Sequence, residues 1–217
     1  MVLLTAILCS YASPPDAAAD RLRAALPLAA KAFLARMQTF KAEEMRSSRV
    51  ITSSGEWKTV ETVSEYEFEV VNGNVREKRR ILRSSDPKSS PTASDLGPLI
   101  LLFDAASIGQ YEFKSTGFSY IGADQVLVFD YRQSDGPESL SITQGRRRKR
   151  VPIQGQLYVR PSTFEVLKAS LEVRRDKTVM DRAEVIYVSG MPAAAVHREF
   201  RDGQLVEETI FRYKVRS

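Results

Sequence analysis

After Ser47 the sequence alternates between hydrophobic and polar residues in run after run, and this period of two is what most limits its fold. In EYEFEV, Tyr66 and Phe68 point to one side of an extended chain, whereas the glutamates point to the other. Asn72-Gly73 follows, and this dipeptide accepts the positive φ values of a tight hairpin turn. Further alternating runs fill the second half of the chain. We therefore expect about ten strands that pair antiparallel with their neighbours.

A helical stretch precedes the strands. Its hydrophobic residues recur every three or four positions, and Asp16 can cap its start. Pro27 interrupts this pattern, so we predict one helix over residues 17–26 and a second over residues 27–44. A short apolar run after Asp95, LGPLILLFDAA, predicts an inserted helix that is buried on more than one side.

These elements predict an α+β fold. An open sheet of about ten twisted strands tends to curl. We therefore expect a strongly curved antiparallel sheet, an unclosed β-barrel, with the N-terminal and inserted helices on its concave face. Residues 13–217 should form this half-barrel as a single domain.

The first twelve residues, MVLLTAILCSYA, carry no charge and are mostly apolar. They are too few to span a bilayer, and Ser10-Tyr11-Ala12 offers the small residues that a signal peptidase accepts. We therefore predict that residues 1–12 are a signal peptide and that the protein is exported to the periplasm. The alternative is that this segment forms a buried helical turn.

Composition argues against most catalytic chemistry. The chain has one cysteine, Cys9, and one histidine, His197, so disulfide frameworks and zinc sites rich in these residues are excluded. Dinucleotide-binding, phosphate-loop and nucleophile-elbow motifs are missing from the sequence. We expect no enzyme activity and no cofactor. A hydrolase built on His197 stays a remote alternative, because nothing identifies its serine.

The glutamates of the EYEFEV strand could in principle act as paired carboxylates in acid–base work. Glu65, Glu67 and Glu69 lie at a spacing of two, which is typical of the solvated face of a half-buried strand. We expect them to pair with cations of the return strand across the hairpin, such as Arg76, Lys78 and Arg80.

The net charge of +5 is accompanied by a run of five consecutive cations. We predict that this run is an exposed loop that contacts an anionic membrane surface. It lacks the interleaved aromatic residues of single-stranded nucleic-acid binders, and an exported protein does not meet chromosomal DNA, so we expect no nucleic-acid partner. The alternative is a merely solvated hairpin loop. The residues of the run are Arg146, Arg147, Arg148, Lys149 and Arg150.

Large hydrophobic residues on the inner face of the sheet are the second candidate site. A wide curved sheet either holds an apolar ligand or fills its concave side with its own side chains. The predicted ligand-binding residues are Tyr66, Phe68, Leu127, Phe129, Leu157 and Leu171.

The order of these elements resembles that of the LolA/LolB-like outer-membrane lipoprotein-sorting proteins. The resemblance rests on the helical AFLARMQTF, on GQLYVRPSTFEVLKASLEV, on YVSGMPAAAVHREF and on ETIFRYKV. It implies an unclosed barrel that wraps around helices and holds acyl chains in an apolar cavity, without catalytic residues. We therefore expect a monomeric, non-enzymatic envelope protein that binds an apolar or lipid-like ligand. The alternative is an envelope scaffold or anionic-surface module with a self-filled core.

Overall fold

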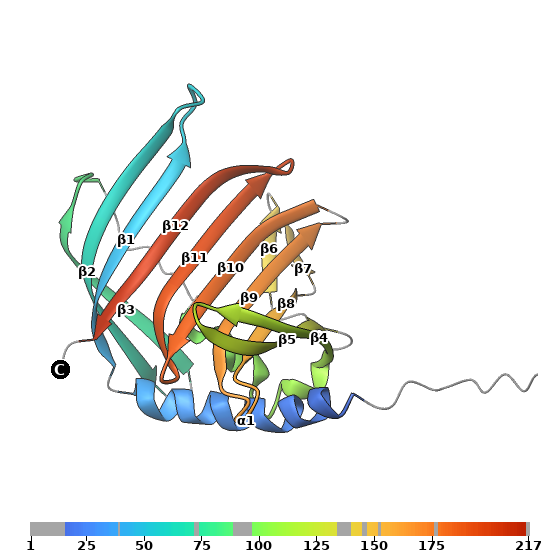
Figure 1. Ribbon diagram of the computed structural model, residues 1–217. Helices are drawn as coiled ribbons and strands as arrows, with labels where there is room; N and C mark the ends of the chain where they lie inside the picture. The colour runs from blue at the N-terminus through green and yellow to red at the C-terminus, as the bar shows by residue number, and fades with distance from the viewer. Residues whose placement is uncertain are drawn as a thin grey trace, which may run out of the picture.

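Ten strands form one antiparallel sheet that curves into an open half-barrel (Figure 1). The computed structural model describes residues 16–38, 40–71, 74–88, 97–133, 140–144, 147–151, 153–175 and 178–215. The strands of the large sheet are β1 (Lys41–Ile51), β2 (Trp57–Val71), β3 (Asn74–Ser84), β4 (Tyr111–Ile121), β5 (Asp124–Gln133), β8 (Ile153–Val159), β9 (Val166–Arg175), β10 (Thr178–Val188), β11 (Met191–Arg201) and β12 (Gln204–Val215). The predicted α+β half-barrel is confirmed.

The order of the strands in the sheet is β3-β2-β1-β12-β11-β10-β9-β8-β5-β4. Most neighbours in this order are also neighbours in sequence, as a meander predicts. The exceptions are β1 beside β12 and β5 beside β8. Between β5 and β8 the chain forms a separate two-stranded hairpin of β6 (Leu140–Gln144) and β7 (Arg147–Val151).

Helix α1 (Ala17–Met37) lies across one end of the half-barrel (Figure 1). Its start is fixed by Asp16, whose Oδ1 accepts a hydrogen bond from the Ala19 N–H at 3.1 Å. The other carboxylate oxygen of Asp16 accepts from the Ser115 N–H on β4 at 2.8 Å. This bond from Ser115 is the main reason that the pKa of Asp16 lies below its ordinary value. One carboxylate therefore caps the helix and ties it to the sheet.

The predicted break at Pro27 is wrong, because α1 continues through it. A proline inside a helix costs about 3 kcal/mol, and burial of one helix face along the whole length offsets this cost. The buried residues of α1 are Ala19, Leu22, Leu26, Ala30, Phe33 and Met37.

Two further helix predictions need correction. The predicted continuation to residue 44 is wrong, since Lys41 already begins β1, which pairs with β2 on one side and with β12 on the other. The inserted apolar run forms the 3-10 helix η1 (Gly97–Phe103) rather than an α-helix, and a second short 3-10 turn, η2 (Ile108–Gln110), follows it. Two strand partners outweigh the helical preference of a few residues at a helix end.

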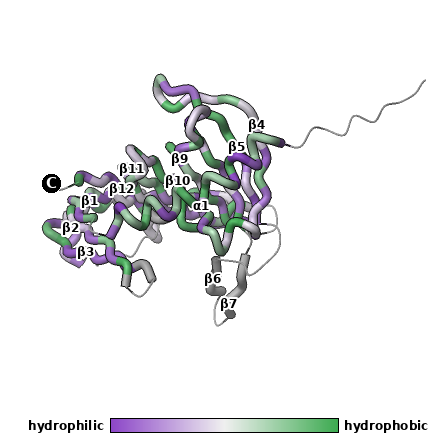
Figure 2. The backbone as a smooth tube through the Cα atoms, turned by 90° about the horizontal axis from the view of Figure 1, so that it is seen from below, coloured by the Kyte–Doolittle hydropathy of each residue, from purple (hydrophilic) through white to green (hydrophobic). Residues whose placement is uncertain are grey.

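The core lies between α1, η1 and the concave face of the sheet. Phe33 of α1 meets Phe68 and Tyr187 edge to face, with ring centroids 6.0 and 6.3 Å apart. Phe103 of η1 meets Tyr131 in the same way at 4.9 Å. Figure 2 shows hydrophobic and hydrophilic positions alternating along the strands, as a sheet with one covered face requires.

Candidate functional site

The six inward residues predicted to bind a ligand belong to one packed cluster. Tyr66, Phe68, Phe129 and Leu157 are at most 1% exposed, and Leu171 is 7% exposed. Leu127 is partly buried against the same cluster, which includes side chains of α1 and η1. The structure therefore brings the predicted residues together, and at the helix-covered end they fill the concave side. Their contact with a ligand stays a prediction.

The basic run lies on a hairpin. Arg146 is outside the described residues, whereas residues 147–150 belong to β7. β7 pairs antiparallel with β6, with Gln144 opposite Arg147 and Ser141 opposite Arg150. The expectation of a loop is thus wrong for the backbone, because β6 supplies a pairing strand. Contact of the run with an anionic surface stays a prediction.

An open apolar groove runs beside α1, and we call it the α1 groove. Its volume is about 470 Å³. Small side chains on α1 leave it open, and Leu28 at its rim is 69% exposed. The turn between β8 and β9, the turn between β10 and β11, and η1 form the other walls. The lining residues are Ala25, Leu28, Ala29, Ala32, Phe33, Arg36, Ile100, Thr163, Phe164, Glu165, Val166, Tyr187 and Gly190.

A cation marks each end of this groove. Arg36, in the last turn of α1, donates from Nη1 to the Ser189 carbonyl at 2.5 Å. Gly190 makes room for it, because a Cβ there would stand 2.4 Å from Arg36 Nη1. Toward the other end, the guanidinium of Arg21 lies 4.7 Å from the ring centroid of Phe164. Between the two ends, η1 and β10 are joined by a hydrogen bond, in which the Ile100 N–H donates to the Tyr187 hydroxyl at 3.2 Å.

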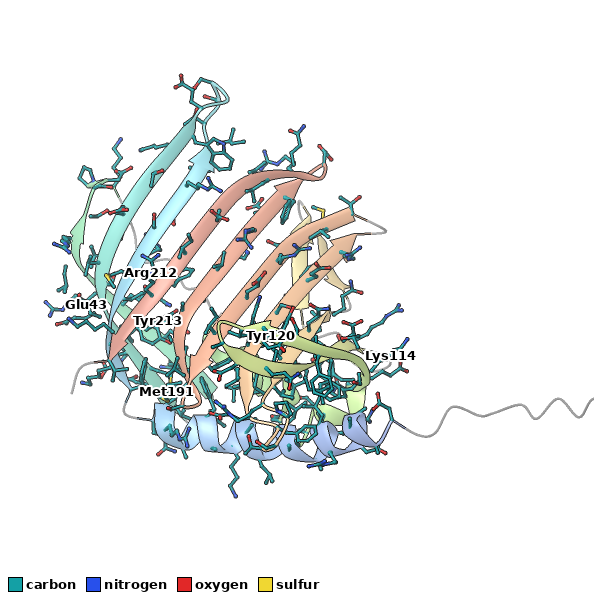
Figure 3. All side chains as sticks on the ribbon, in the orientation of Figure 1. Glu43, Lys114, Tyr120, Met191, Arg212 and Tyr213 are labelled. Atoms are coloured by element: carbon teal, nitrogen blue, oxygen red, sulfur yellow. The ribbon has the colours of Figure 1, made fainter. Side chains whose placement is uncertain are left out.

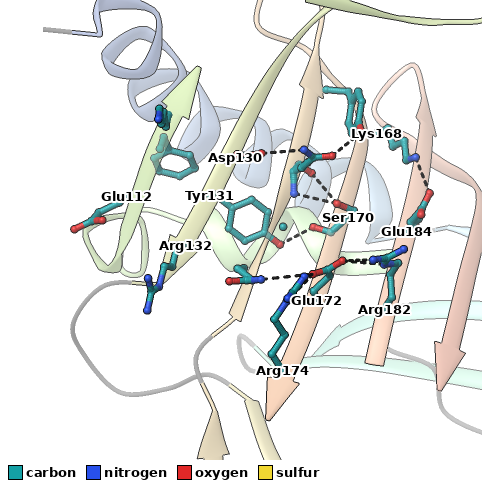
Figure 4. Close-up of a pocket in the computed structure, with 16 residues that line it drawn as sticks. Glu112, Asp130, Tyr131, Arg132, Lys168, Ser170, Glu172, Arg174, Arg182 and Glu184 are labelled. Carbon is teal, nitrogen blue, oxygen red and sulfur yellow. Dashed lines mark hydrogen bonds and ion pairs between the residues drawn. The ribbon is translucent and has the colours of Figure 1, made fainter. Parts of the chain in front are cut away.

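A second hollow, which we call the polar pocket, has a volume of about 650 Å³ (Figure 4). It lies on the face of the sheet opposite the core, because its Glu172 alternates with the inward Leu171 and Val173 of β9. Its polar groups satisfy one another. Tyr131 donates to the Ser170 carbonyl at 2.7 Å, and Lys168 pairs with Glu184 at 2.6 Å.

The electrostatics of the polar pocket disfavour acid catalysis. Burial alone would raise the pKa of Glu172, but hydrogen bonds from Arg174 and Arg182 hold it below its ordinary value. Arg174 Nη2 lies 2.8 Å from Glu172 Oε2. A carboxylate paired in this way stays ionised and is a poor proton donor.

The half of the concave face that lies away from α1 is polar, and we call it the open half. Here His197 Nε2 lies 3.1 Å from Asp181 Oδ1, and the Ser48 and Thr209 hydroxyls lie 2.9 Å apart. The hydrogen bond with Asp181 is the main reason that the pKa of His197 is raised. At the other end of β11, Met191 lies close to α1 (Figure 3).

The described part of the chain shows neither a cluster of metal-ligating side chains nor a membrane-spanning helix. No cluster of three or more His, Cys, Asp or Glu side chains there could hold a metal ion. No described helix is long and apolar enough to cross a membrane.

Sequence reasoning missed the α1 groove. Its walls come from α1, η1 and two turns that are far apart along the chain. The only local signals were the exposed Leu28 on a helix rich in alanine, and Gly190 in a turn.

No family model and no curated protein matches the sequence. Several solved structures align with the chain. A DUF1329 family protein from Desulfovibrio piger is 11% identical, with a TM-score of 0.47 over 90% of this chain and 91% of that one. A LolA superfamily protein from Nitrosomonas europaea is 10% identical, with a TM-score of 0.39 over 90% and 94%.

A putative outer membrane lipoprotein-sorting protein domain from Vibrio parahaemolyticus is 11% identical, with a TM-score of 0.37 over 87% of this chain and 90% of that one. Two of these three structures carry names of the group that the sequence resembles. The identities are 10–11% and the TM-scores are below 0.5, so these alignments carry no argument about function. Function has to be argued from the residues of this chain.

Proposed function

We propose that the protein is a non-enzymatic envelope protein that binds an apolar or lipid-like ligand in the α1 groove. The observation that carries this proposal is an open apolar groove beside a filled core. Its volume of about 470 Å³ falls within the range of about 300–1,000 Å³ that is usual for small-molecule sites. The exposed Leu28 at its rim would be covered by such a ligand.

The chemistry of the polar groups supports a binding role over a catalytic one. His197 is bonded to Asp181, and its raised pKa favours the imidazolium form, which cannot act as a general base. Glu172 is held ionised by two arginines and is a poor general acid. Each of the two candidates for proton transfer is thus engaged with a charged partner of the protein itself.

A substitution that fills the groove tests the proposal. Ala32 is exposed and lines the groove, so Ala32→Trp should block it without disturbing the core. Binding of a neutral monoacylglycerol with a fluorescent label, followed by polarisation, should weaken about tenfold or more, which corresponds to the burial of a few methylene groups. Ala24 is exposed on α1 but lies outside the groove, so Ala24→Trp is the matched control.

Two outcomes would contradict the proposal. One is equal binding by the wild type and by Ala32→Trp; the other is no binding by the wild type. Mass spectrometry of organic extracts from natively purified protein should in addition show a co-purified apolar molecule that Ala32→Trp lacks.

The envelope location rests on residues 1–12, which lie outside the described residues. Export predicts that this segment is cleaved. Intact-mass measurement of the protein from its native host should therefore show a chain that begins near Ser13. A mature chain that still carries Met1 would count against export.

The filled core favours a second candidate function, an envelope scaffold or anionic-surface module. Five of the six predicted inward residues are buried, so the helix-covered end needs no ligand for its own packing. In this case the basic run at residues 146–150 would dock on anionic lipid, with about 1 kcal/mol contributed by each cation.

Replacing the five cations by serine tests this candidate. Binding to vesicles of anionic phospholipid should fall sharply at low salt, while the melting temperature stays nearly unchanged, because exposed charges contribute little to stability. A variant with five lysines keeps the charge and should bind like the wild type. If the serine variant binds such vesicles equally well, the run is only solvated and the docking idea fails.

A further inference from the structure

We propose that the α1 groove selects a single-chain amphiphile with an anionic head, and that Arg36 is the residue that recognises this head. The inference rests on the proposed function, since it names the class of ligand for the same groove. Three observations around Arg36 carry it: its place in the groove, its hydrogen bond to Ser189, and the absence of a carboxylate partner among the described residues.

A hydrogen bond positions Arg36 at the groove before any ligand arrives. Its Nη1 donates to the Ser189 carbonyl at 2.5 Å, across 153 positions of sequence. Gly190 lies beside it with a backbone φ of +72°, a conformation that favours glycine, and it leaves space for Nη1. A guanidinium with one donor already engaged loses less side-chain entropy on binding an anion than one with none engaged.

The described residues leave the charge of Arg36 without an acidic partner, since no carboxylate among them lies within ion-pair distance of it. The acidic residue of the groove lining is Glu165, and it pairs with Arg160 at 3.3 Å. Since Nη1 is engaged by Ser189, the donors on Nε and Nη2 are left for the two oxygens of an anionic head.

The rest of the groove suits one acyl chain. From Arg36 the apolar lining extends back along α1 to Ala25, a rise of about 16 Å along the helix axis. Small residues on this face, Ala29 and Ala32, leave room for a slender chain, and Phe164 closes the far end beneath Arg21. A fixed cation at one end of a narrow apolar channel is complementary to an anionic head with a single tail.

Dodecanoate and its methyl ester share one chain and differ in charge, so they separate head recognition from apolar binding. We expect the wild type to bind dodecanoate about tenfold more tightly than the ester, as measured by displacement of a fluorescent neutral monoacylglycerol. Arg36→Gln should lose this preference while it keeps its affinity for the ester. Lys31→Gln, which removes an exposed α1 charge outside the groove, should behave like the wild type.

The outcomes separate the two proposals. If dodecanoate and its ester bind equally, or if Arg36→Gln keeps the preference, the role of Arg36 is overturned while the proposed function stands. If neither compound binds the wild type, the proposed function itself is overturned, and this inference with it. Dodecyl phosphate is the third compound of the experiment. If it binds more tightly than dodecanoate, the anionic head of the ligand is a phosphate ester; if it binds less tightly, the head is the carboxylate of a fatty acid.

Discussion

The two ends of the concave face are built from the same strands, yet they have opposite chemistry. At the end that α1 covers, β10 contributes Val185 and Tyr187, and β12 contributes Phe211, all of them buried. Further along the same face, β10 carries Asp181 and β12 carries Thr209. β10 and β12 thus turn from apolar to polar on their inner side as they leave the helix.

This difference shows that an inward side chain of a curved sheet is buried only where another element covers the sheet. The open half has polar side chains that satisfy one another, so it can face water without a lid. Exposed apolar surface beside a groove is found on α1, where Leu28 is 69% exposed. The apolar site is therefore associated with the helix rather than with the hollow of the sheet.

The largest expected effect comes from the helix-covered end. Phe129 is fully buried and packs near Phe164, with ring centroids 6.3 Å apart. Phe129→Ala should lower the free energy of unfolding by about 3–5 kcal/mol, because it removes apolar contacts and leaves a cavity. Urea denaturation measures this. Phe118 is 65% exposed on β4, so Phe118→Ala should cost less than about 0.5 kcal/mol. Equal losses in the two variants would show that the covered end is not a packed core.

The next effect concerns a charged cluster near the boundary between the two ends. Arg79 Nε lies 2.9 Å from Glu44 Oε1, and Arg79 Nη1 lies 2.8 Å from Glu77 Oε2. The three side chains are at most 3% exposed. Burial on its own lowers the pKa of Arg79, but hydrogen bonds and charges from the two glutamates raise it overall.

Glu44→Gln should therefore lower the free energy of unfolding by about 3 kcal/mol, since it leaves a buried cation with one partner fewer. Glu65 pairs with Arg80 on the outer face, where the arginine side chain is 72% exposed. Glu65→Gln is thus the control and should cost less than about 1 kcal/mol. If Glu44→Gln lowered the free energy of unfolding by as little as Glu65→Gln, water would have to reach the charged cluster.

The smallest effect belongs to the open half. Hydrogen bonding to Asp181, aided by the charges of Glu207 and Glu199, raises the pKa of His197 in the folded state. Its stabilising contribution is then complete below the unfolded value of about 6.5 and is lost as the pH rises through the folded value. Because the pair is partly exposed, we expect less than about 1 kcal/mol.

His197→Gln should remove this pH dependence, while the wild type loses stability from about pH 6.5 upward. Melting temperatures recorded across this range in both proteins provide the measurement. A wild type that becomes more stable over the same range would contradict the assignment of the pair.

Local pattern was enough to predict some parts of the molecule. The hairpin of β2 and β3 follows from EYEFEV and the Asn-Gly turn, and its register places Val70 opposite Val75. The expected pairing with the return strand is confirmed for two of the three glutamates: Lys78 lies 2.6 Å from Glu69, and Arg80 bonds to Glu65. Glu67 pairs instead with Lys41 of β1, at 2.8 Å. Cross-strand neighbours are close in sequence here, so a few residues determine the result.

Other parts could not be predicted, because they depend on distant partners. The residues around Lys41 do not indicate that a strand begins there, because one of its partner strands, β12, lies some 170 positions later in the sequence. The α1 groove is a still clearer case, since Arg36 and Gly190 meet only in the folded chain. The hydrophobic period and the residue propensities predict which face of a strand is apolar and where the turns lie. Which element covers that face depends on the tertiary fold.

The pairing of β1 with β12 also has a consequence for assembly. This pair joins Ala42 to Val215 and extends to Val50 and Glu207, and it is what attaches β1, β2 and β3 to the rest of the sheet. Contacts over such a sequence separation form slowly, because a very long loop must close first. The hairpin of β2 and β3 must therefore wait, with an unpaired edge at β1, until β12 has been synthesised. During that interval a partner that shields the edge strand would protect the chain from aggregation.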